Sequence, residues 1–123
     1  MKLPLPCLTA LVVCLALLGA CTARAPYEVR KRSSAQEHFE VADNFESVHA
    51  NIMKKLDECT SARTEGKLNT LAGSSRITVG NISMLVEITR VDDALSRVDV
   101  YAMSRGSRMK IPEYGANGKA GCP

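Results

Sequence analysis

Acid–base chemistry in this sequence would depend on four carboxylates in its second half: Glu87, Asp92, Asp93 and Asp99. The strand pattern puts Glu87 and Asp99 on one sheet face, where an acid and a base could meet a substrate. That face is also expected to be wet, and charged side chains are the ordinary occupants of a wet face. We therefore expect no catalytic residue and no enzyme activity.

Metal chemistry would depend on the two histidines, His38 and His49. Asp43 and Glu46 are the carboxylates nearest to them in sequence, but the four residues do not follow a compact ligand spacing. We expect both histidines to be solvated or to cap a helix, and we expect no metal and no cofactor.

The composition argues against nucleic acid as a partner. The net charge is only +3, and the chain has no Trp, three Tyr and two Phe. Such a chain offers neither a strong basic patch nor an aromatic platform on which bases could stack.

The first residues have the parts of an export signal. Lys2 is followed by an uncharged apolar run over residues 8–18, which is too short for a permanent membrane span. The run ends in Leu18-Gly19-Ala20-Cys21. This stretch resembles the lipobox of bacterial lipoproteins, in which a leucine stands three residues before the cysteine and small residues lie between. Gly19 is a mild departure, because Ala or Ser is more usual there.

The resemblance implies that residues 1–20 are removed and that Cys21 carries a diacylglycerol and an N-acyl chain. Several acyl chains hold a protein stably at a membrane. Thr22 stands where an Asp would retain a lipoprotein in the inner membrane, so the resemblance implies the periplasmic side of the outer membrane. The alternative is an ordinary signal peptide that is cleaved nearby, with Cys21 free or disulfide-bonded.

Residues 21–36 show no sustained periodicity and are expected to form the lipidated cysteine and a flexible tether. Within them Arg30, Lys31 and Arg32 form a basic cluster close to the anchor. The cluster could contact lipid phosphates, each charge contributing up to about 1 kcal/mol. The alternative is a solvated linker.

Residues 37–123 are expected to form one small α+β domain. A helix is predicted over residues 44–59, with Asp43 as its cap and Glu46 reaching back to the cap. Its apolar residues recur every three or four positions and form one stripe: Phe45, Val48, Ile52, Leu56 and Cys59.

Strands are predicted over residues 76–79, 82–90 and 95–103, with weaker ones over residues 66–71 and 38–42. Their alternation of apolar and polar residues is typical of an antiparallel sheet that is covered on one side. We therefore expect one amphipathic helix on a sheet of three or four strands, followed by an irregular tail from Arg105. This arrangement is loosely similar to small Gram-negative outer-membrane lipoproteins of unknown function.

Cys59 and Cys122 remain once the lipoprotein resemblance has assigned the other three cysteines. Cys7 and Cys14 lie in the segment to be removed, and Cys21 would carry lipid. We expect Cys59 and Cys122 to form a disulfide that pins the tail. A disulfide to a partner protein, or two free thiols, are the alternatives.

A partner surface is predicted on the polar sheet face, around Leu85 and Tyr101. We expect a lipid-anchored envelope protein that has a structural or protein-interaction role and contacts another envelope protein. The alternative function is a small ligand-binding or enzyme-inhibitor domain that the anchor only localises.

Overall fold

The computed structural model of the chain describes residue 30, residues 35–81 and residues 83–123. Along residues 35–123 the elements follow one another in the order strand, helix, four strands and two short helical segments. Their bounds are β1 (Ala35–Val41), α3 (Phe45–Cys59), β2 (Thr64–Asn69), β3 (Ser74–Val79), β4 (Met84–Asp92), β5 (Leu95–Ala102), the 3₁₀ helix η1 (Ser107–Lys110) and α4 (Ile111–Ala116).

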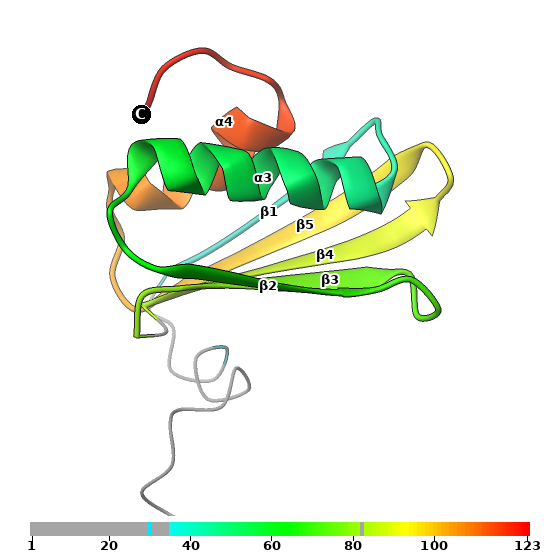
Figure 1. The fold of residues 1–123 in the computed structure, drawn as a ribbon, viewed down its shortest axis with the longest axis horizontal. Helices are drawn as coiled ribbons and strands as arrows, with labels where there is room; N and C mark the ends of the chain where they lie inside the picture. Colours follow the sequence, from blue (N-terminus) through cyan, green and yellow to red (C-terminus); the bar gives the residue numbers. More distant parts are fainter. Residues whose placement is uncertain (1–29, 31–34, 82) are drawn as a thin grey trace, which may run out of the picture.

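The five strands form one antiparallel sheet in the order β1-β5-β4-β3-β2. α3 carries the chain from β1 at one edge to β2 at the other, and the next strands return as a meander until β5 pairs with β1 (Figure 1). The predicted α+β class is confirmed. The predicted number of three or four strands was too low, because both weakly patterned segments, β1 and β2, pair as edge strands.

α3 begins one residue later than its predicted cap implies. The backbone of Asn44 is extended, and its side-chain Oδ1 accepts a hydrogen bond from Ser47 N at 2.9 Å. Asn44 is therefore the N-cap. The carboxylate of Asp43 instead accepts from the Asn44 N–H at 2.8 Å. The predicted pairing of Asp43 with Glu46 is thus replaced by a cap one position further along.

The core lies between α3 and one face of the sheet. Phe45, Val48, Ile52 and Leu56 of α3 are buried, as the predicted stripe requires. Facing them are the alternate residues of the central strands, and full burial of each Val, Ile or Met side chain among them stabilises the fold by roughly 1.5–3 kcal/mol. They are Ile77 and Val79 of β3, Met84, Val86 and Ile88 of β4, and Val98, Val100 and Ala102 of β5.

The segment after β5 is not the irregular tail that was expected. It forms η1 and α4, and it buries Met109 and Ile111 in the core. α4 packs closely against α3 at Gly115. A Cβ atom at this position would lie 2.8 Å from Lys55 Cβ and 2.9 Å from Asn51 O. The absence of a side chain at Gly115 therefore permits the contact between the helices.

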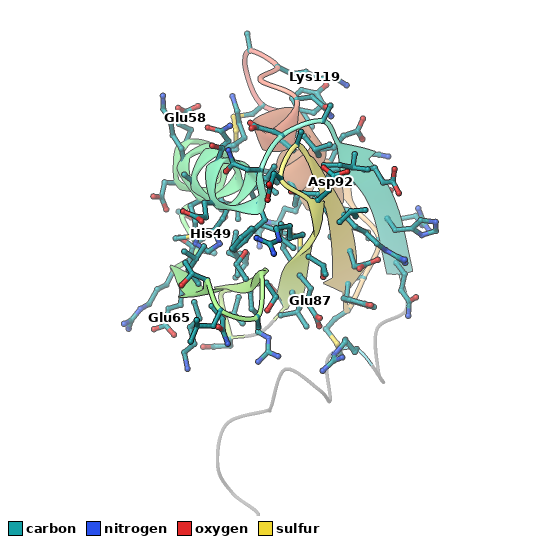
Figure 2. The ribbon with its side chains drawn as sticks, turned by 90° about the vertical axis from the view of Figure 1, so that its right-hand side faces the viewer. His49, Glu58, Glu65, Glu87, Asp92 and Lys119 are labelled. Carbon is teal, nitrogen blue, oxygen red and sulfur yellow. A yellow bond between two sulfur atoms is a disulfide. The ribbon has the colours of Figure 1, made fainter. Side chains whose placement is uncertain are left out.

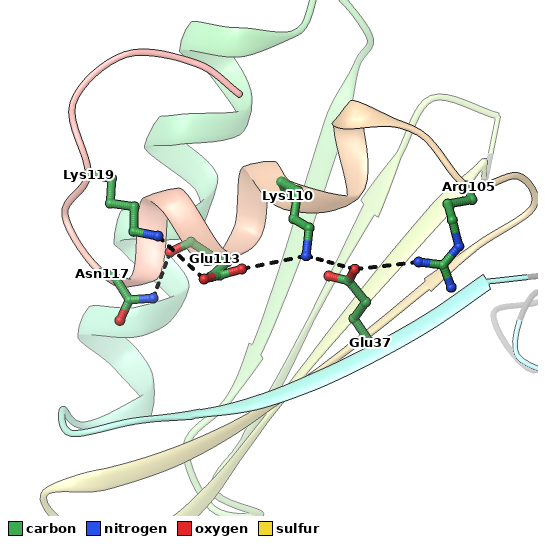
Figure 3. A network of polar contacts seen from close by, with 6 residues as sticks. All are labelled: Glu37, Arg105, Lys110, Glu113, Asn117 and Lys119. Carbon is green, nitrogen blue, oxygen red and sulfur yellow. Dashed lines mark hydrogen bonds and ion pairs between the residues drawn. The ribbon is translucent and has the colours of Figure 1, made fainter.

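Ion pairs connect α4 and η1 to the edge strand β1. Glu37 points to the α3 side of β1, and its side chain is only 18% exposed. Its carboxylate lies 3.0 Å from Lys110 Nζ and 3.9 Å from Arg105 (Figure 3). Glu113 contacts Lys110 and Lys119 in the same network. These cations compensate a carboxylate that would otherwise be costly beside the core.

The predicted disulfide is confirmed: Cys59, at the end of α3, is bonded to Cys122. The bond spans 63 residues of sequence. In the chain-entropy account, a closed loop of that size stabilises the fold by roughly 4 kcal/mol. Lys55 Nζ also donates to the carbonyl of Gly121 at 3.2 Å, so the returning segment is held at two neighbouring points.

We predict that Gly115→Ala lowers the free energy of unfolding by about 1–3 kcal/mol, because the new methyl group must displace backbone atoms of α3. Urea unfolding of the purified protein measures the change. Gly106→Ala is the matched control, since its backbone is extended and nothing lies within 4 Å of the added atom. An equal stability loss in both variants would contradict the proposed contact.

Candidate functional site

The sheet face that points away from α3, here called the outer face, carries a row of five titratable side chains. Strand register places them directly opposite one another from edge to edge of the sheet. The row, called the charged row below, consists of Lys67 (β2), Arg76 (β3), Glu87 (β4), Asp99 (β5) and His38 (β1). In Figure 2, Glu87 lies on the side of the strands away from α3. The prediction that Glu87 and Asp99 share a face is confirmed.

The acidic half of the charged row is compensated by arginines. Glu87 Oε1 lies 3.0 Å from Arg30 Nε. Asp99 Oδ1 lies 3.3 Å from both Nε and Nη2 of Arg97. Like charges on opposing residues of neighbouring strands destabilise a sheet, and these contacts offset that repulsion. Both pairs are partly exposed, so each contributes less than about 1 kcal/mol.

Leu85 and Tyr101, the predicted partner surface, are brought together by the structure. They are direct neighbours across β4 and β5. Leu85, however, is 0% exposed although it lies on the outer face, whereas Tyr101 is half-buried. Tyr101 is therefore the accessible member of the pair, and a role in binding a partner stays a prediction.

The surroundings of Tyr101 raise the pKa of its phenol above the ordinary value of 10.0. Burial raises its pKa most, and the negative charges of Asp99 and Glu87 raise it further. Arg30 and Arg97 act in the opposite direction. At neutral pH the hydroxyl keeps its proton, so it can donate a hydrogen bond to a partner.

The basic half of the charged row lines an open hollow of about 250 Å³ on the outer face. Arg76 Nε is buried and has no hydrogen-bond partner among the described residues. The polar side chains around this hollow, called the Arg76 hollow below, come from three strands. They are Lys67 and Asn69 of β2, Ser74 and Arg76 of β3, and Glu87 and Thr89 of β4. Sequence reasoning missed this group, because only the register of the β2–β3 hairpin brings Lys67 opposite Arg76.

Of the other two carboxylates considered for acid–base chemistry, Asp92 ends β4 and Asp93 lies in the turn to β5. Asp92 Oδ1 accepts a hydrogen bond from Ala94 N at 2.8 Å, which is a turn-forming contact. Asp93 is paired loosely with Arg90 at 3.8 Å. Asp92 and Asp93 therefore have local structural contacts, and the charged row contains only Glu87 and Asp99 of the four candidates.

The two histidines occupy different environments. His38 is exposed on the outer face of β1, whereas His49 lies between α3 and the β2–β3 hairpin (Figure 2). A Cβ atom on Gly66 would lie only 2.8 Å from the His49 ring, so the glycine makes room for the imidazole. Within the described part of the chain, no group of three or more His, Cys, Asp or Glu residues could hold a metal ion.

The residues expected to anchor the protein lie almost entirely outside the described residues. This holds for Cys21 and for Lys31 and Arg32 of the basic cluster. Arg30 of that cluster is described and contacts Glu87. No helix in residues 30, 35–81 and 83–123 is long and apolar enough to cross a membrane.

We predict that His49 makes the fold less stable in mild acid. Burial lowers its pKa from the usual 6.5, so the unfolded chain binds a proton at a higher pH than the folded chain does. Stability should therefore fall as the pH drops through about 6.5, and this loss should level off below the folded pKa.

Urea unfolding between about pH 7 and pH 5 measures this effect. His49→Gln should reduce the loss of stability over that range, whereas His38→Gln, at an exposed position, should leave it unchanged. The explanation fails if the two variants behave alike.

Comparisons with protein families, with curated proteins and with solved structures find no match for this chain.

Proposed function

We propose that this chain is a lipid-anchored protein of the bacterial cell envelope, held at the periplasmic side of the outer membrane by Cys21. The structural observation that supports the export step of this proposal is the Cys59–Cys122 disulfide. Stable disulfides are typical of exported proteins. The bond also accounts for the only cysteines outside the signal-like segment and its lipobox.

Within this proposal, the domain acts as a protein-interaction module. The outer face supports this role, because it presents charges of both signs and the half-buried Tyr101 beside a buried Leu85. Aromatic residues with a polar end are common at the centre of protein interfaces. A charged sheet face suits the surface of another protein better than it suits a small apolar substrate.

The second candidate, a small ligand-binding domain localised by the anchor, is favoured by one observation. Arg76 and its polar neighbours line an open hollow, and Arg76 Nε is buried there without a hydrogen-bond partner among the described residues.

Lipidation predicts a specific mature mass. Protein purified from bacterial membranes should begin at Cys21 and carry the added mass of acyl chains, as intact mass spectrometry measures. Cys21→Ser should remove the acyl mass and release the domain from the membrane fraction, whereas Cys14→Ser should change neither. A mature protein of unmodified mass that begins at another residue would refute the anchor.

A partner on the outer face predicts site-specific crosslinking in intact cells. A photoreactive amino acid at position 101 should give a discrete protein adduct on illumination. The matched position is Leu71, which is 100% exposed in the β2–β3 turn and lies off the outer face. Equal adducts from both positions, or none from position 101, would contradict the proposed surface.

A further inference from the structure

The two halves of the charged row differ in how their charges are compensated. Glu87 and Asp99 each have an arginine within 3.3 Å. Lys67 and Arg76 are also like charges in direct register, yet neither has an ion-pair partner among the described residues. Like charges on opposing residues destabilise a sheet. A negatively charged group bound between Lys67 and Arg76 would therefore reduce their repulsion.

The surroundings of this pair supply further donors for such a group. The hydroxyls of Ser74 and Thr89 line the same hollow as the two cations. The four side chains come from three neighbouring strands, so they border the hollow at different positions across the sheet. Its volume of about 250 Å³ is several times the roughly 30 Å³ occupied by one water molecule, so a small oxyanion can enter.

Arg76 is the residue on which the argument depends most. Its Nε atom is buried and has no hydrogen-bond partner among the residues that the structure describes, and an unsatisfied buried donor is unfavourable. Glu87 stands directly opposite Arg76 on β4, but its carboxylate contacts Arg30 at 3.0 Å. Arg30 thus draws the nearest acid toward itself, and the Arg76 guanidinium remains available to an incoming anion.

We propose that the Arg76 hollow binds the phosphate group of a ligand. Arg76 and Lys67 supply the charge, and the Ser74 and Thr89 hydroxyls donate hydrogen bonds. A tetrahedral phosphate has oxygens in several directions and so matches donors from three strands, and charge-assisted contacts to phosphate are among the strongest that arginine makes. This proposal rests on the second candidate function and names the chemical class of its ligand, and it does not depend on the lipid anchor.

The test uses the Cys21→Ser chain, which the proposed function expects to carry no lipid, and inorganic phosphate as the probe, titrated at constant ionic strength against chloride. Phosphate should give saturable NMR shifts at residues 67, 74, 76 and 89. Arg76→Gln should weaken binding about tenfold or more, as the loss of a charged hydrogen bond implies. Glu87→Gln should tighten binding, because it removes the negative charge that lines the hollow.

Arg63→Gln is the matched control, since it removes the same charge from a side chain that is 84% exposed and outside the hollow. It should leave phosphate binding unchanged, and urea unfolding confirms that each variant is folded. Equal weakening by Arg63→Gln and Arg76→Gln, or shifts that never saturate, would overturn the proposal.

Vesicles then identify the source of the phosphate group. Arg76-dependent binding to vesicles that contain phosphatidylglycerol, with none to phosphatidylcholine alone, assigns the hollow to lipid headgroups. Arg76-dependent binding of inorganic phosphate without vesicle binding assigns it to a soluble phosphate-bearing ligand. Either result supports the site. If Arg76→Gln changes the binding of neither inorganic phosphate nor vesicles, the proposal is refuted.

Discussion

The packing of one apolar helix stripe on one face of one sheet is the constraint on which this structure depends. Phe45, Val48, Ile52 and Leu56 are all buried in the core that α3 forms with this face of the sheet. The five strands must therefore present every second residue toward α3. A period of two leaves the intervening residues on the opposite face, where water favours charge. The strand register that aligns the core residues on one face therefore also aligns the charged row on the opposite face.

The elements with strong periodicity could be predicted from the sequence, and those fixed by long-range pairing could not. α3, β4 and β5 follow their patterns within a few residues. α4 was missed because it has only six residues and is stabilised by contact with α3 at Gly115, which a local pattern does not contain. β1 was predicted as a weak and shorter strand. All of its residues pair with β5, and this long-range pairing, which a local pattern does not contain, sets its length.

In the candidate site, too, the features that depend on alternation along one strand could be predicted, and those that depend on pairing or packing with other segments could not. Alternation along β4 and β5 was enough to predict that Glu87 and Asp99 share a face. It also placed Leu85 on that face, but burial depends on neighbouring side chains, and Leu85 proved inaccessible. The pairing of Lys67 with Arg76 required the exact hairpin register, which the weak pattern of β2 did not define.

The place of β1 in the sheet has a consequence for how copies of this chain could associate. β1 is the first strand in sequence, yet it pairs with β5, and the helix and three strands lie between them in the chain. Pairing between such distant segments closes slowly during folding. Without β1, the edge of β5 would expose unpaired backbone groups, onto which a strand of the same sequence from another molecule could pair. Since residues 42–44 form a short connection to α3, exchange of β1 between two copies is the form of domain swapping that this topology favours.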